Sequence, residues 1–192
     1  TAVYQGGTAH TGEAGGEADI KAYMAHAEIG VNIEKFSVRV GGLYMTGDDE
    51  ADNDVENYFG IDTDNTMLGS VVLFECLDPM TYYAFYGPQA GRYGAMHLYA
   101  HFGVELDKNT DLRVGALWLN AAEDIVYIDG SGQKDNNLGY EINAELTHKI
   151  TKNLTFALAG GYLIAEDGAD ALASDGDSDD LWKVISMFRF KF

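Results

Sequence analysis

Hydrophobic and polar residues alternate along much of the chain, in segments about as long as a strand that crosses a membrane. The alternation is clearest in the last twelve residues, Leu181–Phe192. Residues two apart in a strand share a face, so this segment has one apolar face and one basic face. The apolar face holds Trp182, Val184, Ser186, Phe188, Phe190 and Phe192, and the other holds Leu181, Lys183, Ile185, Met187, Arg189 and Lys191.

The same alternation recurs upstream and predicts an all-β chain. The expected strands are Ile20–Ile33, Phe36–Met45, Met96–Leu106, Leu112–Asn120, Leu138–Ile150, Leu154–Ala165 and Leu181–Phe192, and Thr1–Gln5 has the pattern of the end of one more. This gives about eight strands in a single domain, residues 1–192. The expected outward residues of the fifth of these segments are Leu138, Tyr140, Ile142, Ala144, Leu146 and Ile150.

The connections between these segments alternate in length. Three are tight turns, at Ile33–Phe36, Asp107–Asp111 and Thr151–Asn153. The others are long: Gly6–Asp19, Gly47–Ala95, Ala121–Asn137 and Glu166–Asp180. Short turns on one side and long loops on the other are typical of a transmembrane antiparallel up-and-down β-barrel, with its turns in the periplasm.

A soluble antiparallel barrel or sandwich also has alternating strands, with the apolar face inside. The pattern alone does not say which face is the inner one. The apolar faces carry large residues along full strand lengths, whereas the polar faces mix charges of both signs with glycine and alanine. We therefore favour the membrane barrel, with the polar faces lining a lumen.

Composition supports this interpretation and excludes other classes. Glycine is frequent at 23 and proline rare at 2, which permits long strands, and the 12 tyrosines fit aromatic belts. The net charge of −19 argues against nucleic-acid binding. The single cysteine, Cys76, excludes an intrachain disulfide. No apolar run is long enough for a membrane-spanning helix. The chain opens at Thr1 without a basic and apolar leader, so we expect either that a leader was removed or that the sequence is a fragment.

The final hexapeptide, Met187-Phe-Arg-Phe-Lys-Phe192, resembles the signal that the barrel assembly machinery reads in outer-membrane proteins of Gram-negative bacteria. Phe188, Phe190 and Phe192 carry this resemblance. The stretch from Leu138 to Leu163 and the segment Gly41-Gly-Leu-Tyr-Met-Thr-Gly-Asp-Asp49 are similar to hairpins of alginate-export-like and related proteobacterial porins.

The resemblance implies a bacterial outer-membrane location, a signal peptide, about 14 to 18 strands and passive diffusion of small hydrophilic solutes. Because this chain has fewer strands, we expect it to be the C-terminal part of a larger barrel. A complete eight-stranded barrel is the alternative. The expected partners are outer-membrane lipid and lipopolysaccharide, the solutes, the barrel assembly machinery and further copies of the chain.

Charged residues and histidines on the polar faces are the candidate lumen and selectivity residues. In a wide pore, opposed charges set a transverse field that selects solutes, whereas in a narrow barrel they pair and fill the interior. His97 and His101 share a strand face roughly 13 Å apart, too far for joint metal ligation. The candidates are Glu28, Arg39, His97, His101, Glu105, Arg113, Glu141, Glu145, Lys183, Arg189 and Lys191.

Acidic loops are the candidate cation sites. Asp48, Asp49, Asp52 and Asp54 crowd one loop, and carboxylate clusters can hold Ca²⁺. The spacing of a twelve-residue calcium loop is absent, so the alternative is solvated charge with loosely bound Ca²⁺ that bridges to lipopolysaccharide. No other cofactor is expected.

Two functional classes follow: a passive porin, and a plugged structural or anchoring barrel that presents acidic loops to partners. Residues 67–94 hold aromatic clusters that either fold into the lumen as a constriction, cover the outer mouth or pack against a partner. No convincing Ser/His/acid set is present, so we do not expect an enzyme.

Overall fold

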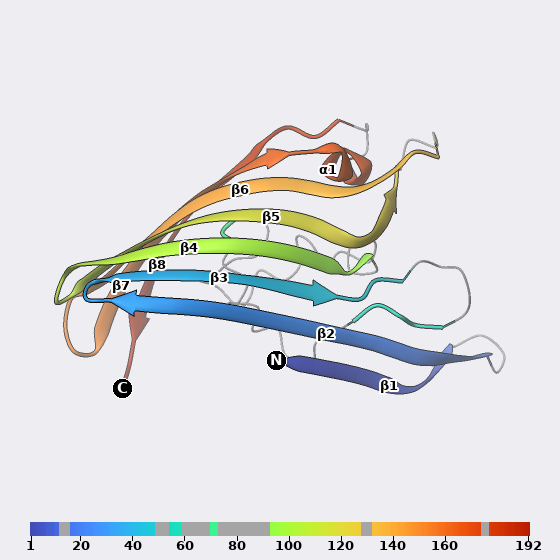
Figure 1. Ribbon diagram of the computed structural model, residues 1–192, viewed down its shortest axis with the longest axis horizontal. Helices are drawn as coiled ribbons and strands as arrows, with labels where there is room; N and C mark the ends of the chain where they lie inside the picture. The colour runs from blue at the N-terminus through green and yellow to red at the C-terminus, as the bar shows by residue number, and fades with distance from the viewer. Residues whose placement is uncertain (12–15, 49–53, 59–69, 73–92, 128–131, 174–176) are drawn as a thin grey trace.

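The chain forms one antiparallel β-sheet of eight strands in a computed structural model, which describes all residues except 12–15, 49–53, 59–69, 73–92, 128–131 and 174–176 (Figure 1). A single short helix lies between the last two strands in the described part of the chain. The elements are β1 (Ala2–Thr11), β2 (Gly16–Ile33), β3 (Phe36–Met45), β4 (Ala95–Asp107), β5 (Thr110–Val126), β6 (Lys134–Lys149), β7 (Leu154–Ala165), α1 (Asp167–Leu172) and β8 (Leu181–Phe190).

The strands follow one another in the sheet in sequence order, so every strand pairs with its neighbour in the chain. The predicted all-β, antiparallel, up-and-down arrangement is thus confirmed. The sheet curls into a trough, and β7 and β8 pass behind β3 and β4 in the view of Figure 1. β1 and β8 are the two edge strands, and no pairing between them occurs among the described residues.

The predicted strand boundaries are right for two strands and too short for several others. β3 and β7 begin and end at the predicted residues. The predicted loop Gly6–Asp19 is wrong, because Ala9 pairs with Ala18 in a ladder that runs from Ala2 to Thr11. The predicted loop Ala121–Asn137 is too long, since β5 runs to Val126 and β6 begins at Lys134. The predicted loop Glu166–Asp180 contains α1.

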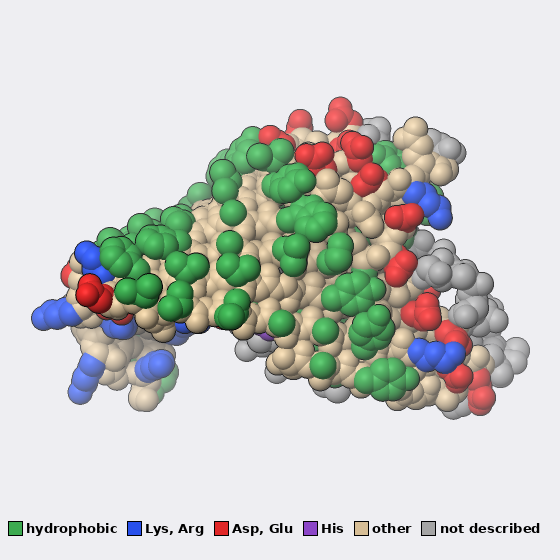
Figure 2. Space-filling view, viewed as in Figure 1, with side chains coloured by type: hydrophobic (Ala, Val, Ile, Leu, Met, Phe, Trp, Pro, Cys, Tyr) green, Lys and Arg blue, Asp and Glu red, His purple; other side chains and the backbone are tan. Residues whose placement is uncertain are grey.

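The convex face of the sheet carries large hydrophobic side chains that are exposed along the strands (Figure 2). Most of them occupy the positions predicted to point outward, so the alternation assigned most side chains to the correct faces. They include Tyr23, Ile29, Val31, Ile33, Leu98, Phe102, Val114, Tyr140, Ile142, Tyr162, Ile164, Trp182, Val184, Phe188 and Phe190.

The concave face has a different character at its two ends. Towards the long loops it holds the main hydrophobic core, which includes Tyr99, Leu117, Leu119 and Leu163. Val72 and Tyr93, from the connection between β3 and β4, pack into this core. Towards the short turns the same face is polar and charged.

Leu138 is an exception to the predicted alternation. We expected it to point outward, but it is buried with 1% of its surface exposed. A β-bulge explains the reversal: Leu119 pairs with Gly139 and Asn120 with Asn137, so Leu138 is an extra residue in β6. Gly139 has a φ of 129°, a backbone conformation that L side chains rarely adopt. The bulge turns Leu138 into the core.

Gly139→Ala is therefore expected to destabilise the sheet strongly. A Cβ at this position would lie 2.0 Å from the carbonyl oxygen of Ile164 and would also strain the backbone. We expect a loss of about 2–3 kcal/mol in the free energy of unfolding, measured by urea denaturation. Gly160→Ala is the control, since its Cβ would meet only ordinary contacts at 3.7 Å. Equal stability of the two variants would contradict the bulge.

Candidate functional site

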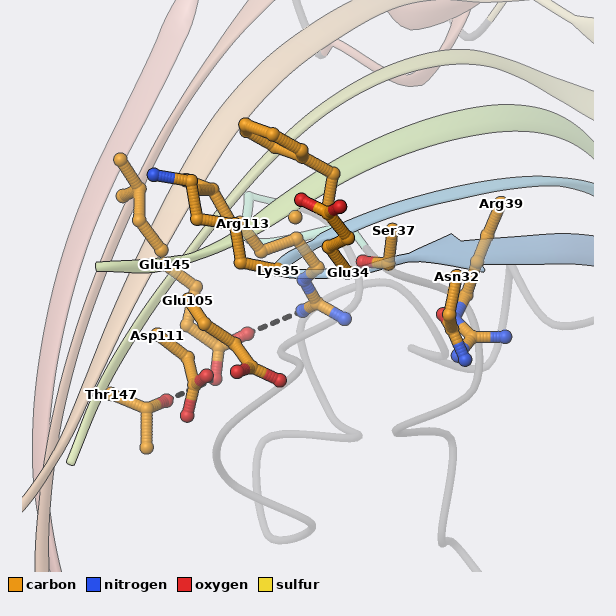
Figure 3. Close-up of a pocket in the computed structure, with 14 residues that line it drawn as sticks. Asn32, Glu34, Lys35, Ser37, Arg39, Glu105, Asp111, Arg113, Glu145 and Thr147 are labelled. Carbon is orange, nitrogen blue, oxygen red and sulfur yellow. Dashed lines mark hydrogen bonds and ion pairs between the residues drawn. The ribbon is translucent and has the colours of Figure 1, made fainter. Parts of the chain in front are cut away.

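The polar part of the concave face encloses a hollow of about 460 Å³ near the short turns (Figure 3). Its lining comes from five adjacent strands, β2 to β6, and from the turn between β2 and β3. Because successive residues point to opposite faces, these strands place their charged positions side by side on one wall. The charged and polar lining residues are Asn32, Glu34, Lys35, Ser37, Arg39, Glu105, Asp111, Arg113, Glu145 and Thr147.

Two arginines on this wall are held by glutamates of the neighbouring strands. Arg39 lies with its Nη1 3.4 Å from Oε1 of Glu28. Arg113 pairs with Glu145 across β5 and β6 (Figure 3). Both pairs are partly exposed, and such pairs contribute only about 0–1 kcal/mol to stability. Their main effect is to fix positive and negative groups at set positions on the wall.

Tyr99 links the first of these pairs to the interior. Its hydroxyl donates a hydrogen bond of 3.0 Å to Oε2 of Glu28, and Nε2 of His26 lies 2.8 Å from the same hydroxyl. Gly41 makes room for the ring, since a Cβ there would lie 2.4 Å from the Tyr99 hydroxyl oxygen. Tyr99 is not among the lumen residues predicted from the sequence. The glycine on the adjacent strand was the signal that could have revealed it.

Glu141 is the most deeply buried of the predicted lumen carboxylates, with 1% of its surface exposed. It accepts hydrogen bonds from the backbone N–H of Val71 at 2.6 Å and of Val72 at 3.2 Å. The Ser70 hydroxyl and, at 2.7 Å, the Asn143 amide also donate to it. A buried carboxylate needs such donors, because an unsatisfied charge in a protein interior is costly.

Glu141 thereby holds the segment 70–72 against the concave face. Val71 packs on Ala157 and Ala159 of β7, and Ile185 and Met187 of β8 flank this contact. Gly161 accommodates the segment, since a Cβ there would lie 3.0 Å from side-chain atoms of both valines. Of the region 67–94, residues 70–72, 93 and 94 are described, and the aromatic cluster and Cys76 lie outside the described residues.

His97 and His101 are buried among the inner residues of β4, with 0% and 7% of their surfaces exposed. The ring of His101 stacks on that of Tyr99, with 5.1 Å between the ring centroids. Both histidines therefore belong to the packed part of the concave face. Neither lines the hollow near the short turns.

The last strand has the two predicted faces. Lys183 is half-buried on the inner face, and Arg189 and Lys191 are exposed near the end of the strand. Phe188, Phe190 and Phe192 are exposed. The Phe188 ring also contacts Phe156 of β7, at 5.1 Å between centroids.

The predicted calcium site is only partly described. Asp54 pairs with Lys21 of β2, and Asp48 is half-buried. Asp49 and Asp52 lie outside the described residues. Within the described part of the chain, no group of three potential metal ligands comes together. Calcium binding by this loop stays a prediction.

No protein-family model matches the chain, and no curated protein sequence matches it significantly. Among the residues that the structure describes, no helix is both long enough and apolar enough to cross a membrane.

The anchoring role of Glu141 can be tested by hydrogen exchange. Glu141→Ala removes the acceptor of the Val71 and Val72 amides, and hydrogen bonds to charged groups contribute about 1.5–3 kcal/mol each. We expect these amides to exchange at least about tenfold faster in the variant, measured by mass spectrometry of the peptide that contains them.

Glu145→Ala is the matched control, because Glu145 lies on the same face of β6 and pairs with Arg113 instead. Unchanged protection of residues 70–72 in Glu141→Ala would show that apolar packing alone holds the segment.

Proposed function

We propose that this chain forms the wall of a β-barrel in a bacterial outer membrane and acts as a porin for small hydrophilic solutes. The observation that carries the proposal is the division of the sheet into two unlike faces. The concave face near the short turns is charged with both signs, and the convex face is covered with exposed large hydrophobic residues.

The convex face is poorly suited to water. A fully buried valine, leucine or phenylalanine gains about 1.5–3 kcal/mol over an exposed one, and soluble monomers rarely expose large contiguous apolar patches. A hollow of about 510 Å³ on this face is lined largely by Leu98, Ala100, Trp118, Tyr140 and Ile142. Contact with lipid chains removes such a surface from water, so the convex face favours a membrane protein over a soluble sandwich.

In a membrane, the open edges of the sheet also require partners. Backbone N–H and C=O groups that face lipid without hydrogen bonds cost several kcal/mol each, so spanning sheets are closed. The outer edges of β1 and β8 are not paired with each other among the described residues. We therefore propose that further strands complete the barrel and that this chain is the C-terminal part of a larger porin.

The wall described above would select solutes by charge. Arg39 and Arg113 are fixed beside Glu28 and Glu145, with Glu105 on the same wall. Opposite charges at fixed positions in a low-dielectric wall create a local field that polar solutes experience as they pass. Acidic loops at the other end would contact lipopolysaccharide, with Ca²⁺ as a loosely bound bridge.

A plugged structural barrel is the second candidate, and one observation favours it. Val72, Tyr93 and Ala171, which lie outside the strands, pack into a hydrophobic core on the concave face. This core fills the end near the long loops, where α1 also lies (Figure 1). A pore would have to pass beside it, whereas a plugged barrel would not conduct.

Conductance in planar lipid bilayers tests the porin against the plugged barrel. We expect the inserted protein to pass ions, and we expect single changes on the wall to shift the reversal potential in a salt gradient. Arg113→Gln should shift it towards cation selectivity and Glu145→Gln towards anion selectivity, because each removes one fixed charge of opposite sign. The double variant should lie between them.

Lys134→Gln is the control, since Lys134 is exposed at the start of β6, on the side of the long loops. Verified insertion without current would contradict the porin and favour the plugged barrel. Full recovery of the protein in the soluble fraction without detergent would contradict both.

A further inference from the structure

The short-turn end of the sheet gathers lysines at the border of the apolar convex face. We define these five residues as the lysine rim: Lys35, Lys108, Lys149, Lys152 and Lys191. All five are exposed, and they occupy or adjoin the three short turns and the end of β8. Figure 2 shows this clustering of basic side chains at the narrow end of the molecule.

The opposite end of the sheet has the reverse charge. Lys21 and Lys134 lie there, Lys21 pairs with Asp54, and Lys183 lies on the inner face near the start of β8. Acidic side chains dominate there, as Figure 2 shows. They include Glu17, Asp19, Asp124, Asp135, Asp167, Asp177, Asp179 and Asp180. A chain with a net charge of −19 thus places much of its positive charge at one end.

Exposed apolar residues lie directly beside the lysine rim. Ile33, Phe36, Leu106 and Ile150 flank the three short turns, with 63%, 39%, 54% and 48% of their surfaces exposed. The Lys35 ammonium lies 5.4 Å above the ring of Phe36, so its side chain bends back over the apolar border. A cation at the edge of an apolar band sits at the level of lipid headgroups when the band is in a bilayer.

Acidic residues also lie at this end, but they are fewer than the lysines of the rim. The carboxylate of Asp107 accepts hydrogen bonds from the Asn109 N–H at 2.8 Å and from the Thr110 hydroxyl at 2.9 Å. Glu105 and Asp111 line the hollow on the concave face. With Glu34, these acids number four in the described short turns and the strand ends beside them, against the five lysines of the rim.

We propose that the lysine rim binds the phosphates of anionic phospholipids in the leaflet that surrounds the short turns. The proposal rests on the proposed membrane location and adds a specific lipid class to it. Each lysine near an anionic membrane surface contributes about 1 kcal/mol, which corresponds to about a fivefold preference. Charge complementarity selects the headgroup, and the adjoining apolar residues hold the acyl chains.

The test uses the full chain reconstituted in phosphatidylcholine vesicles that contain a minor fraction of phosphatidylglycerol. After mild detergent extraction, native mass spectrometry compares the lipids that stay bound with those of the bulk membrane. We expect phosphatidylglycerol to be enriched about fivefold or more, and the enrichment to fall as salt screens the lysines. The variant K35Q/K108Q should lose most of this enrichment.

The variant K21Q/K134Q is the matched control, with the same change in charge at the other end, and it should retain the enrichment. K35R/K108R keeps the positive charge and should also retain it, which separates loss of charge from loss of folding. Equal retention of the two lipids by the wild type, or an equal loss in K21Q/K134Q, overturns the proposal. Insertion and conductance without enrichment would overturn this proposal alone, whereas failure to insert would overturn the proposed function with it.

Discussion

The rest of the structure depends on the ladders of backbone hydrogen bonds that join eight strands in sequence order. In such a ladder, side chains must alternate between the two faces, so each residue is committed to the face that its position gives it. In β4, His97, Tyr99 and His101 point to the concave side, whereas Leu98 and Phe102 are exposed on the convex side. A slip of one residue would exchange these sets and bury polar groups in the wrong environment.

The side chains that point to the concave face form two different regions along the same strands. Near the long loops, apolar side chains pack with Val72 and Tyr93, and the buried carboxylate of Glu141 is surrounded by donors. Near the short turns, arginines and glutamates stay partly exposed around a hollow. The first region is a packed core, and the second leaves a charged surface open to solvent.

The alternation of large residues was enough to predict the strands that form the centre of the sheet. It failed at Leu138, because a bulge depends on a glycine backbone conformation that a period-two pattern does not contain. It also failed between Gly6 and Asp19, where small residues such as Ala9 and Ala18 pair without an apolar signal.

In the candidate site, contacts between adjacent strands could be predicted from the sequence, whereas contacts between residues far apart in the chain could not. Arg113 and Glu145 are directly paired across β5 and β6, so strand register placed them together. The contact between Glu141 and the segment 70–72 joins residues about seventy positions apart, and no local pattern specifies it. The environment of Tyr99 likewise depended on a glycine in the next strand. Local pattern can predict the pairing of neighbouring strands, but it cannot predict the contacts of a segment inserted between two strands.

The order of the strands has a kinetic consequence. Three of the hairpins close over turns of a few residues, so their strands can pair with little loss of chain entropy. The pairing of β3 with β4 must instead wait for Met45 and Ala95 to meet across the longest connection in the chain. Loop-closure entropy grows only by about 0.6 kcal/mol for each doubling of length, so this step is slow without being prohibitive. The longest connection therefore divides the strands into two groups, β1–β3 and β4–β8, and loop-closure entropy favours pairing within each group over pairing between them.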